Sequence, residues 1–103
     1  MGSHHEYLEY VLELLRDTSN ITHRQMMGEF VLYSQGVVIG GVYDDRFLLK
    51  QTPASLRLLP DSELCSPYPG AKEMLLVETE DPVLIATVVR QMLPELPAPK
   101  AKK

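Results

Sequence analysis

The chain has 103 residues, of which 45% are hydrophobic and 23% charged, and its formal net charge is −4. This length suits one domain, and the composition is that of an ordinary globular protein. No apolar run approaches the ~18 residues that a membrane span needs, and the acidic balance disfavours a broad nucleic-acid-binding face. A single cysteine, Cys65, excludes an intrachain disulfide and favours a reducing cytoplasm. We therefore expect a cytoplasmic domain without a membrane association.

An amphipathic helix is predicted at the start of the chain. Ser3 and Glu6 have the spacing of a capping box. Apolar residues then recur on one helical face, namely Leu8, Val11, Leu12 and Leu15. The helix is expected to end in the polar cluster 17–20, whose short side chains favour turns. Residues 1–5 match either a native start or the remnant of an expression tag, so we assign them no function.

A compact antiparallel meander is predicted between residues 28 and 50. Its strands, 29–33, 37–43 and 46–50, are rich in the β-branched and aromatic residues that suit a pleated sheet. Segment 21–27 fits either an entering strand or an extended approach to Gly28. Gly40-Gly41 lacks the pattern of a phosphate loop, so a bulge or a close packing contact is expected there.

Two further helices and one strand are predicted after the meander. Thr52-Pro53 and Asp81-Pro82 each supply an N-cap residue followed by proline at the first helical position. The expected buried residues of these helices are Leu56, Leu58 and Leu59 in the first and Ile85, Val88, Val89 and Met92 in the second. Segment 61–72 is predicted to be a proline-rich loop and segment 74–77 a short strand.

The order of these elements predicts a two-layer α+β domain with helices on one face of the sheet. The domain is expected to span residues 1–96, and the proline- and lysine-containing tail 97–103 is expected to be disordered. Val37-Val38-Ile39 is apolar throughout, which indicates that part of the other sheet face is also covered. Either the proline-rich loop or a second copy of the protein would provide that cover.

Two groups of polar residues are candidates for a functional site. His23, Arg24 and Glu29 combine a histidine, a cation and a carboxylate, which could bind an anion or move a proton. An exposed or hydrogen-bonded histidine is the simpler interpretation. The second group is the segment Asp44-Asp45-Arg46, whose adjacent carboxylates could hold a cation. Adjacent aspartates between two strands also suit a tight turn, which we favour.

A third candidate is the rigid loop Pro67-Tyr68-Pro69-Gly70-Ala71-Lys72, which places an aromatic ring and an ammonium group before a strand. Such a loop could grip an extended or anionic ligand. The alternative, which we favour, is a lid with Tyr68 packed on the core and Gly70 supplying a positive φ angle. The sequence has no metal-ligand spacing, no nucleophile elbow and no paired cysteines, so neither a metal nor a cofactor is expected.

Three segments of the chain, taken in order, resemble the N-terminal domain of the TfoX/Sxy family of competence regulators. They are Met26-Met27-Gly28-Glu29-Phe30, Tyr43-Asp44-Asp45-Arg46-Phe47-Leu48-Leu49-Lys50 and Pro67-Tyr68-Pro69-Gly70-Ala71-Lys72. The preceding helix and the tail from Leu96 look like those of short single-domain members. The resemblance implies an α+β fold with about five antiparallel strands in an α-β-β-β-α-β-β-α-like order. It also implies a regulatory role, and it supplies no catalytic residues.

Together these observations predict a non-enzymatic regulatory or adaptor domain that contacts a protein partner of unknown identity. Its expected surface combines the edge of the meander with the Tyr68 loop, and a homodimer is a further hypothesis. The alternative is a small-ligand-binding protein or enzyme in which His23, Glu29, Asp45 and Lys72 meet in one pocket. Binding to nucleic acid is expected to be weak or indirect, through the lysines of the tail.

Overall fold

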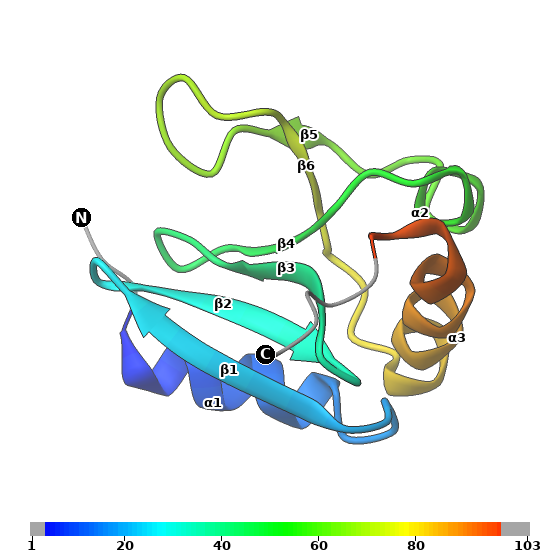
Figure 1. The fold of residues 1–103 in the computed structure, drawn as a ribbon, viewed down its shortest axis with the longest axis horizontal. Coiled ribbons are helices and arrows are strands. Elements are labelled where there is room, and N and C mark those ends of the chain that lie inside the picture. Colours follow the sequence, from blue (N-terminus) through cyan, green and yellow to red (C-terminus); the bar gives the residue numbers. More distant parts are fainter. Residues whose placement is uncertain (1–3, 98–103) are drawn as a thin grey trace, which may run out of the picture.

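The computed structural model describes residues 4–97 of the chain, and they fold into an α+β domain (Figure 1). The helices are α1 (His5–Leu14), α2 (Pro53–Leu58) and α3 (Pro82–Met92), with a 3-10 turn η1 (Leu93–Glu95). The strands are β1 (Ile21–Met26), β2 (Glu29–Ser34), β3 (Val37–Val42), β4 (Phe47–Leu49), β5 (Leu64–Cys65) and β6 (Met74–Leu76). The predicted fold class is therefore confirmed.

The six strands form one open antiparallel sheet in the order β1-β2-β3-β4-β6-β5. The predicted meander corresponds to β2, β3 and β4. Segment 21–27, which the sequence left open, contributes β1 at one edge of the sheet. Segment 61–72 is not wholly a loop as predicted, because Leu64 and Cys65 pair with Leu75 and Met74 of β6. The sheet therefore has six strands, where about five were expected, and the strand that the expected order lacks is β1, since that order already places two strands between the last two helices.

Three two-residue turns join the first four strands. Their central residues are Met27-Gly28, Gln35-Gly36 and Asp44-Asp45, and all six have positive φ angles between 52° and 83°. Positive φ at both central positions is the property of the type I′ turn, whose twist matches that of the flanking strands. The predicted turn at Asp44-Asp45 is confirmed, because Tyr43 and Arg46 exchange two backbone hydrogen bonds of 2.9 and 3.0 Å across it.

The main hydrophobic core lies between the helices and one face of the sheet. Alternate residues of β2, Phe30 and Leu32, are buried there, whereas Val31 and Tyr33 face the other way and are half-buried. Side chains of all three helices join the same core, which comprises Leu8, Val11, Leu14, Leu15, Phe30, Leu32, Ile39, Val42, Phe47, Leu49, Ala54, Leu59, Leu75, Val77, Ile85, Val88, Val89 and Met92. This confirms the buried stripe predicted for α3.

The opposite sheet face is partly covered by the chain itself. Leu48 is fully buried although it stands in register with Gly41, on the face away from the main core. Pro67 of the proline-rich loop is buried as well. The hypothesis that this loop helps to cover the second face is therefore supported.

The sequence predicted the starts of α2 and α3 correctly but not the start of α1. Thr52 caps α2 in a full capping box with Ser55, and the Asp81 side chain accepts a hydrogen bond from the Val83 N–H at the start of α3. Helix α1 begins at His5 with His4 as its N-cap, so Glu6 is not three residues from the cap as the predicted capping box requires. Ser3 lies outside the described residues.

Leu56 was predicted to be a buried residue of α2, but 43% of its surface is exposed, because the six-residue helix turns that position outward while Ala54 and Leu59 enter the core. The tail prediction falls mainly on residues 98–103, which lie outside the described residues.

Candidate functional site

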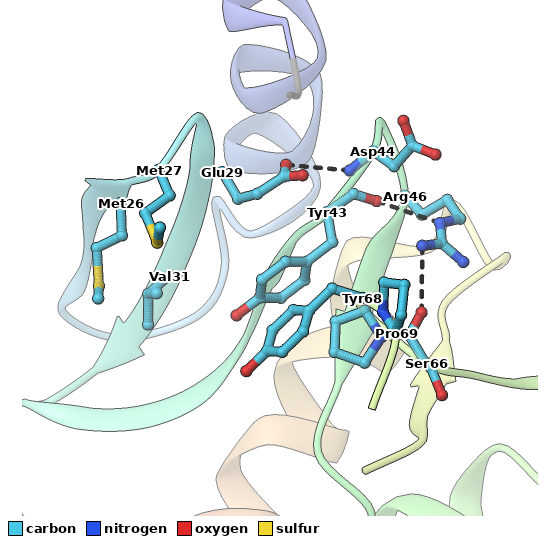
Figure 2. Close-up of a pocket in the computed structure, with 11 residues that line it drawn as sticks. Met26, Met27, Glu29, Val31, Tyr43, Asp44, Arg46, Ser66, Tyr68 and Pro69 are labelled. Carbon is cyan, nitrogen blue, oxygen red and sulfur yellow. Dashed lines mark hydrogen bonds between the residues drawn. The ribbon is translucent and has the colours of Figure 1, made fainter. Parts of the chain in front are cut away.

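An open groove of about 920 Å³ lies on the sheet face opposite the main core (Figure 2). Three segments far apart in the sequence form it: the turn between β1 and β2, the turn between β3 and β4, and the proline-rich loop. We call it the tyrosine groove, and its lining residues are Met26, Met27, Glu29, Val31, Tyr43, Asp44, Arg46, Ser66, Pro67, Tyr68 and Pro69.

The β1–β2 hairpin supplies an apolar and highly exposed side of the groove. Met26 is 50% exposed and Met27 is 99% exposed at the tip of the hairpin. The register pairs Met26 with Glu29 and Arg24 with Val31, so these four side chains lie on the groove face of the sheet. Flexible thioether side chains of this kind adapt to partners of varied shape.

The β3–β4 turn supplies the polar end of the groove. The Glu29 carboxylate accepts a hydrogen bond of 3.1 Å from the Asp44 N–H, which ties this turn to the β1–β2 hairpin (Figure 2). The Asp45 carboxylate instead turns to the start of α1, where it accepts the His4 N–H at 2.9 Å and lies 2.7 Å from His4 Nδ1. The two adjacent aspartates thus make different contacts: Asp44 bonds Glu29 through its backbone N–H, and Asp45 bonds His4 through its carboxylate.

The proline-rich loop closes the groove with a tight turn. The Ala71 N–H donates to the Tyr68 carbonyl at 3.1 Å, and Gly70 between them has a φ of +86°. Proline followed by glycine at the central positions is the pattern of a type II turn. Arg46 anchors the loop, because its guanidinium donates to the carbonyls of Tyr43 and Ser66 at 3.2 and 3.3 Å. The positive φ predicted for Gly70 is confirmed.

Two tyrosines lie side by side in the groove (Figure 2). The ring centroids of Tyr43 and Tyr68 are 6.4 Å apart with an interplanar angle of 58°. Gly41 lies under the Tyr43 ring, because a Cβ atom at that position would fall 2.5 Å from the ring atom Cε2. Burial, followed by the neighbouring Tyr68 and Glu29, raises the pKa of Tyr43 above its ordinary value of 10.0. Tyr43 is thus a protonated hydroxyl donor at neutral pH.

Tyr68 is the more accessible of the two rings. It is 60% exposed, so the prediction that it packs on the core as part of a lid is wrong. Pro67 is the buried residue of this loop, and it holds the loop against the sheet while the Tyr68 ring remains available to solvent. An exposed, rigid aromatic ring of this kind is suited to recognition.

Of the predicted site residues, Glu29, Asp44, Arg46 and Tyr68 line the tyrosine groove. Lys72 lines an adjoining pocket of about 400 Å³, which shares Tyr43, Pro67 and Tyr68 with the groove. Arg24 is exposed on the groove face of β1, beside Val31.

His23 does not join this set. It pairs with the buried Leu32, and its ring meets the edge of the Phe30 ring at a centroid distance of 6.2 Å, so it lies on the helical face. Asp45 turns to His4, as described above. The pocket predicted from His23, Glu29, Asp45 and Lys72 is therefore not formed, because these residues lie on different faces and in different cavities.

The apolar lining of the groove was missed as a set of functional residues. These residues belong to the predicted strands and turns or to the segments of the family resemblance, but isolated apolar residues carry no chemical signal. They are Met26, Met27, Val31 and Tyr43. Recognising Met27-Gly28 as a two-residue turn would have revealed the face of each neighbour, because the register then follows from strand alternation.

The described part of the chain shows neither a metal-binding cluster nor a membrane-spanning helix. Within residues 4–97, no three histidine, cysteine, aspartate or glutamate side chains gather closely enough to hold a metal ion. None of the helices in the same residues has the length and apolar character to cross a bilayer.

Comparison with known proteins finds a relative that aligns with the whole of this chain. No family model matches the sequence. The chain is 30% identical over 105 aligned positions to an uncharacterised 12.7 kDa protein in the trpE 5′ region of Spirochaeta aurantia, and the match covers 100% of this chain and 91% of the relative. This chain belongs to the same protein family as the 12.7 kDa protein of Spirochaeta aurantia.

Proposed function

We propose that this chain is a non-enzymatic regulatory or adaptor domain that binds another protein through the tyrosine groove. One observation carries the proposal: the three segments that resemble the TfoX/Sxy N-terminal domain, though far apart in sequence, meet in this groove. A shared surface is the simplest reason for such segments to converge. The proposed setting is the cytoplasm, in keeping with the regulatory role that the resemblance implies.

The composition of the groove supports a protein partner. Met27, Tyr68 and Met26 are 99%, 60% and 50% exposed and form an apolar surface beside polar groups of Glu29 and Arg46. Protein interfaces are enriched in tyrosine, methionine and arginine, and their apolar centres are surrounded by polar groups that orient the partner. A partner that covers these side chains removes apolar area from water, which favours association.

The test is affinity capture of partners by wild-type protein and by Tyr68→Ala. Because Tyr68 is largely exposed, its truncation should leave the fold intact while it weakens capture by about tenfold or more, as expected for an aromatic hot spot. Val83→Ala is the matched control, since Val83 is 64% exposed and lies on α3, away from the groove. Equal capture by wild type and Tyr68→Ala would contradict the proposal, provided that circular dichroism shows both to be folded.

Small-ligand binding is a second candidate, because the groove volume falls in the range typical of ligand sites. Its binding groups would be the two tyrosines, Glu29 and Arg46. A library of small molecules, screened by thermal shift, separates the two candidates, since a ligand specific to the native state must raise the unfolding temperature. A stabilising compound whose effect is lost in Tyr68→Ala would favour this candidate over the adaptor role.

A further inference from the structure

Strand β1 is the long open edge of the sheet. Within residues 4–97 it pairs with β2 on one side only, and five of its six residues are exposed. The other edge is β5, which has just two residues. An open edge strand presents unpaired backbone groups to which another chain can add as a strand. The sheet therefore has one edge long enough to accept such an addition.

The hairpin register identifies the backbone groups at this edge. The two-residue turn makes Met26 and Glu29 a hydrogen-bonded pair, so the even-numbered residues of β1 direct their N–H and C=O groups toward β2. The hydrogen bond of 3.0 Å from the Gln35 N–H to the Asn20 carbonyl follows the same alternation. Ile21, His23 and Gln25 consequently direct their N–H and C=O groups outward, at the open edge.

The side chains of β1 favour an acidic partner. The strand, Ile-Thr-His-Arg-Gln-Met, has no acidic residue although the whole chain has a net charge of −4. Arg24 is exposed on the groove face, and no carboxylate in residues 4–97 lies within ion-pair distance of it. A carboxylate opposite Arg24 on an added strand would form a favourable cross-strand pair.

The same charge disfavours a second copy of this chain as the added strand. In an antiparallel pair of β1 strands, the residues whose N–H and C=O groups point outward must lie opposite one another. A second copy can therefore pair with the midpoint of the two strands at His23 or at Arg24, and the paired length is the same in both registers. Centring on Arg24 places the two Arg24 residues directly opposite each other, and centring on His23 makes them diagonal neighbours with a residue spacing of about 7–8 Å. Both registers bring like charges together.

We propose that β1 accepts an extended acidic segment of a partner protein as an additional strand, a proposal that rests on the adaptor function. In the added segment, a glutamate or aspartate faces Arg24. An apolar residue, two positions further along the segment, faces Met26. That residue lies beside Met27 at the exposed side of the tyrosine groove, so the edge and the groove form one continuous binding surface.

The test uses two synthetic probes and the full chain. One peptide carries a glutamate and, two positions along, a valine, so that both side chains face the same side of the added strand; the matched control carries lysine in place of the glutamate. Nuclear magnetic resonance titration should show that wild type binds the glutamate peptide about fivefold or more tightly than the lysine peptide, and that Arg24→Glu reverses the preference. Arg24 is exposed, so the variant is expected to fold, and its amide spectrum verifies this.

Amide exchange separates strand addition from simple charge attraction. The His23 and Gln25 amides should exchange more slowly when the glutamate peptide is bound, whereas the Arg24 amide, already directed to β2, should change little. Binding without this alternation, binding of both peptides alike, or no binding by millimolar peptide would overturn the proposal. Self-association of the chain that excludes the peptide would identify a second copy as the occupant instead.

These results do not depend on Tyr68. If Tyr68→Ala abolishes partner capture while neither peptide binds, the adaptor function stands and strand addition fails. If the glutamate peptide binds as described but capture is unaffected by Tyr68→Ala, the edge is a binding site and the role of the groove fails.

Discussion

At the scale of single residues, the contact between His4 and Asp45 joins the start of α1 to the β3–β4 turn. The Asp45 carboxylate accepts the His4 N–H at 2.9 Å and contacts Nδ1 at 2.7 Å. A carboxylate near a helix N-terminus also complements the helix dipole. This contact fixes the turn that ends the tyrosine groove. Both of its side chains, the His4 imidazole and the Asp45 carboxylate, titrate.

The contact predicts how the stability of the fold changes with pH. Its hydrogen bond with Asp45 raises the pKa of His4 above 6.5, and the hydrogen bonds from His4 lower the pKa of Asp45 below 3.8. The His4 contribution to stability is present below pH 6.5 and is lost as pH rises through the raised pKa. The Asp45 contribution is present above pH 3.8 and is lost as pH falls through the lowered pKa. Both operate fully between these two values.

The pKa of His4, measured by nuclear magnetic resonance titration, tests this contact. We expect Asp45→Asn to return the His4 pKa toward 6.5, since the charged acceptor is removed. Asp44→Asn is the matched control, because asparagine tolerates the same left-handed backbone and Asp44 contacts Glu29 through its N–H. Equal effects of the two substitutions would show a general effect of negative charge instead of a specific contact.

At the scale of elements, the turn in the proline-rich loop sets the position of Tyr68. Gly70 has a φ of +86°, and an added Cβ would meet no atom within 4 Å. Substitution at this position therefore changes backbone strain without steric collision. The turn is held otherwise by the hydrogen bond between Ala71 and Tyr68 and by Arg46 at Ser66.

Gly70→Ala should lower the free energy of unfolding by about 1 kcal/mol, because alanine is strained in the left-handed region. Gly70→Asn should cost less, since asparagine adopts this conformation more readily. Urea unfolding followed by circular dichroism measures both. Equal losses for the two variants, or no loss for alanine, would show that the φ angle of Gly70 does not limit the turn.

The elements differ in how far local sequence could predict them. The meander follows from β-branched and aromatic runs separated by turn residues, and the caps at Thr52 and Asp81 are local patterns that the structure reproduces. Strand β5 could not be predicted in this way, because two residues between polar and proline-containing segments have no periodicity of their own. Its pairing is provided by β6, which lies nine residues further along.

The candidate site was predictable only in part, for the same reason. Asp44-Asp45 was identified as a turn from its composition, and Glu29, Arg46 and Tyr68 were named individually. Their convergence depends on sheet order, which no local pattern specifies. His23 was grouped with Glu29 because the two are near in sequence, yet strand alternation places them on opposite faces.

At the scale of the whole molecule, the two faces of the sheet have different roles. One face packs against the three helices and holds the main core. The other face is covered at β4, where Leu48 is fully buried, and is left open at the tyrosine groove. The stable core thus lies behind the groove, so the surface side chains can serve recognition without loss of the fold.

The most direct test of the adaptor role places a photo-crosslinking benzoylphenylalanine at position 68 and, separately, at position 83. Both native side chains are similarly exposed, at 60% and 64%, but Val83 lies on α3 and Tyr68 in the groove. Irradiation in the cells that make the protein is expected to give a specific protein adduct from position 68 and not from position 83. Adducts from position 83 alone, or the same adducts from both positions, would contradict the tyrosine groove as the protein-binding surface.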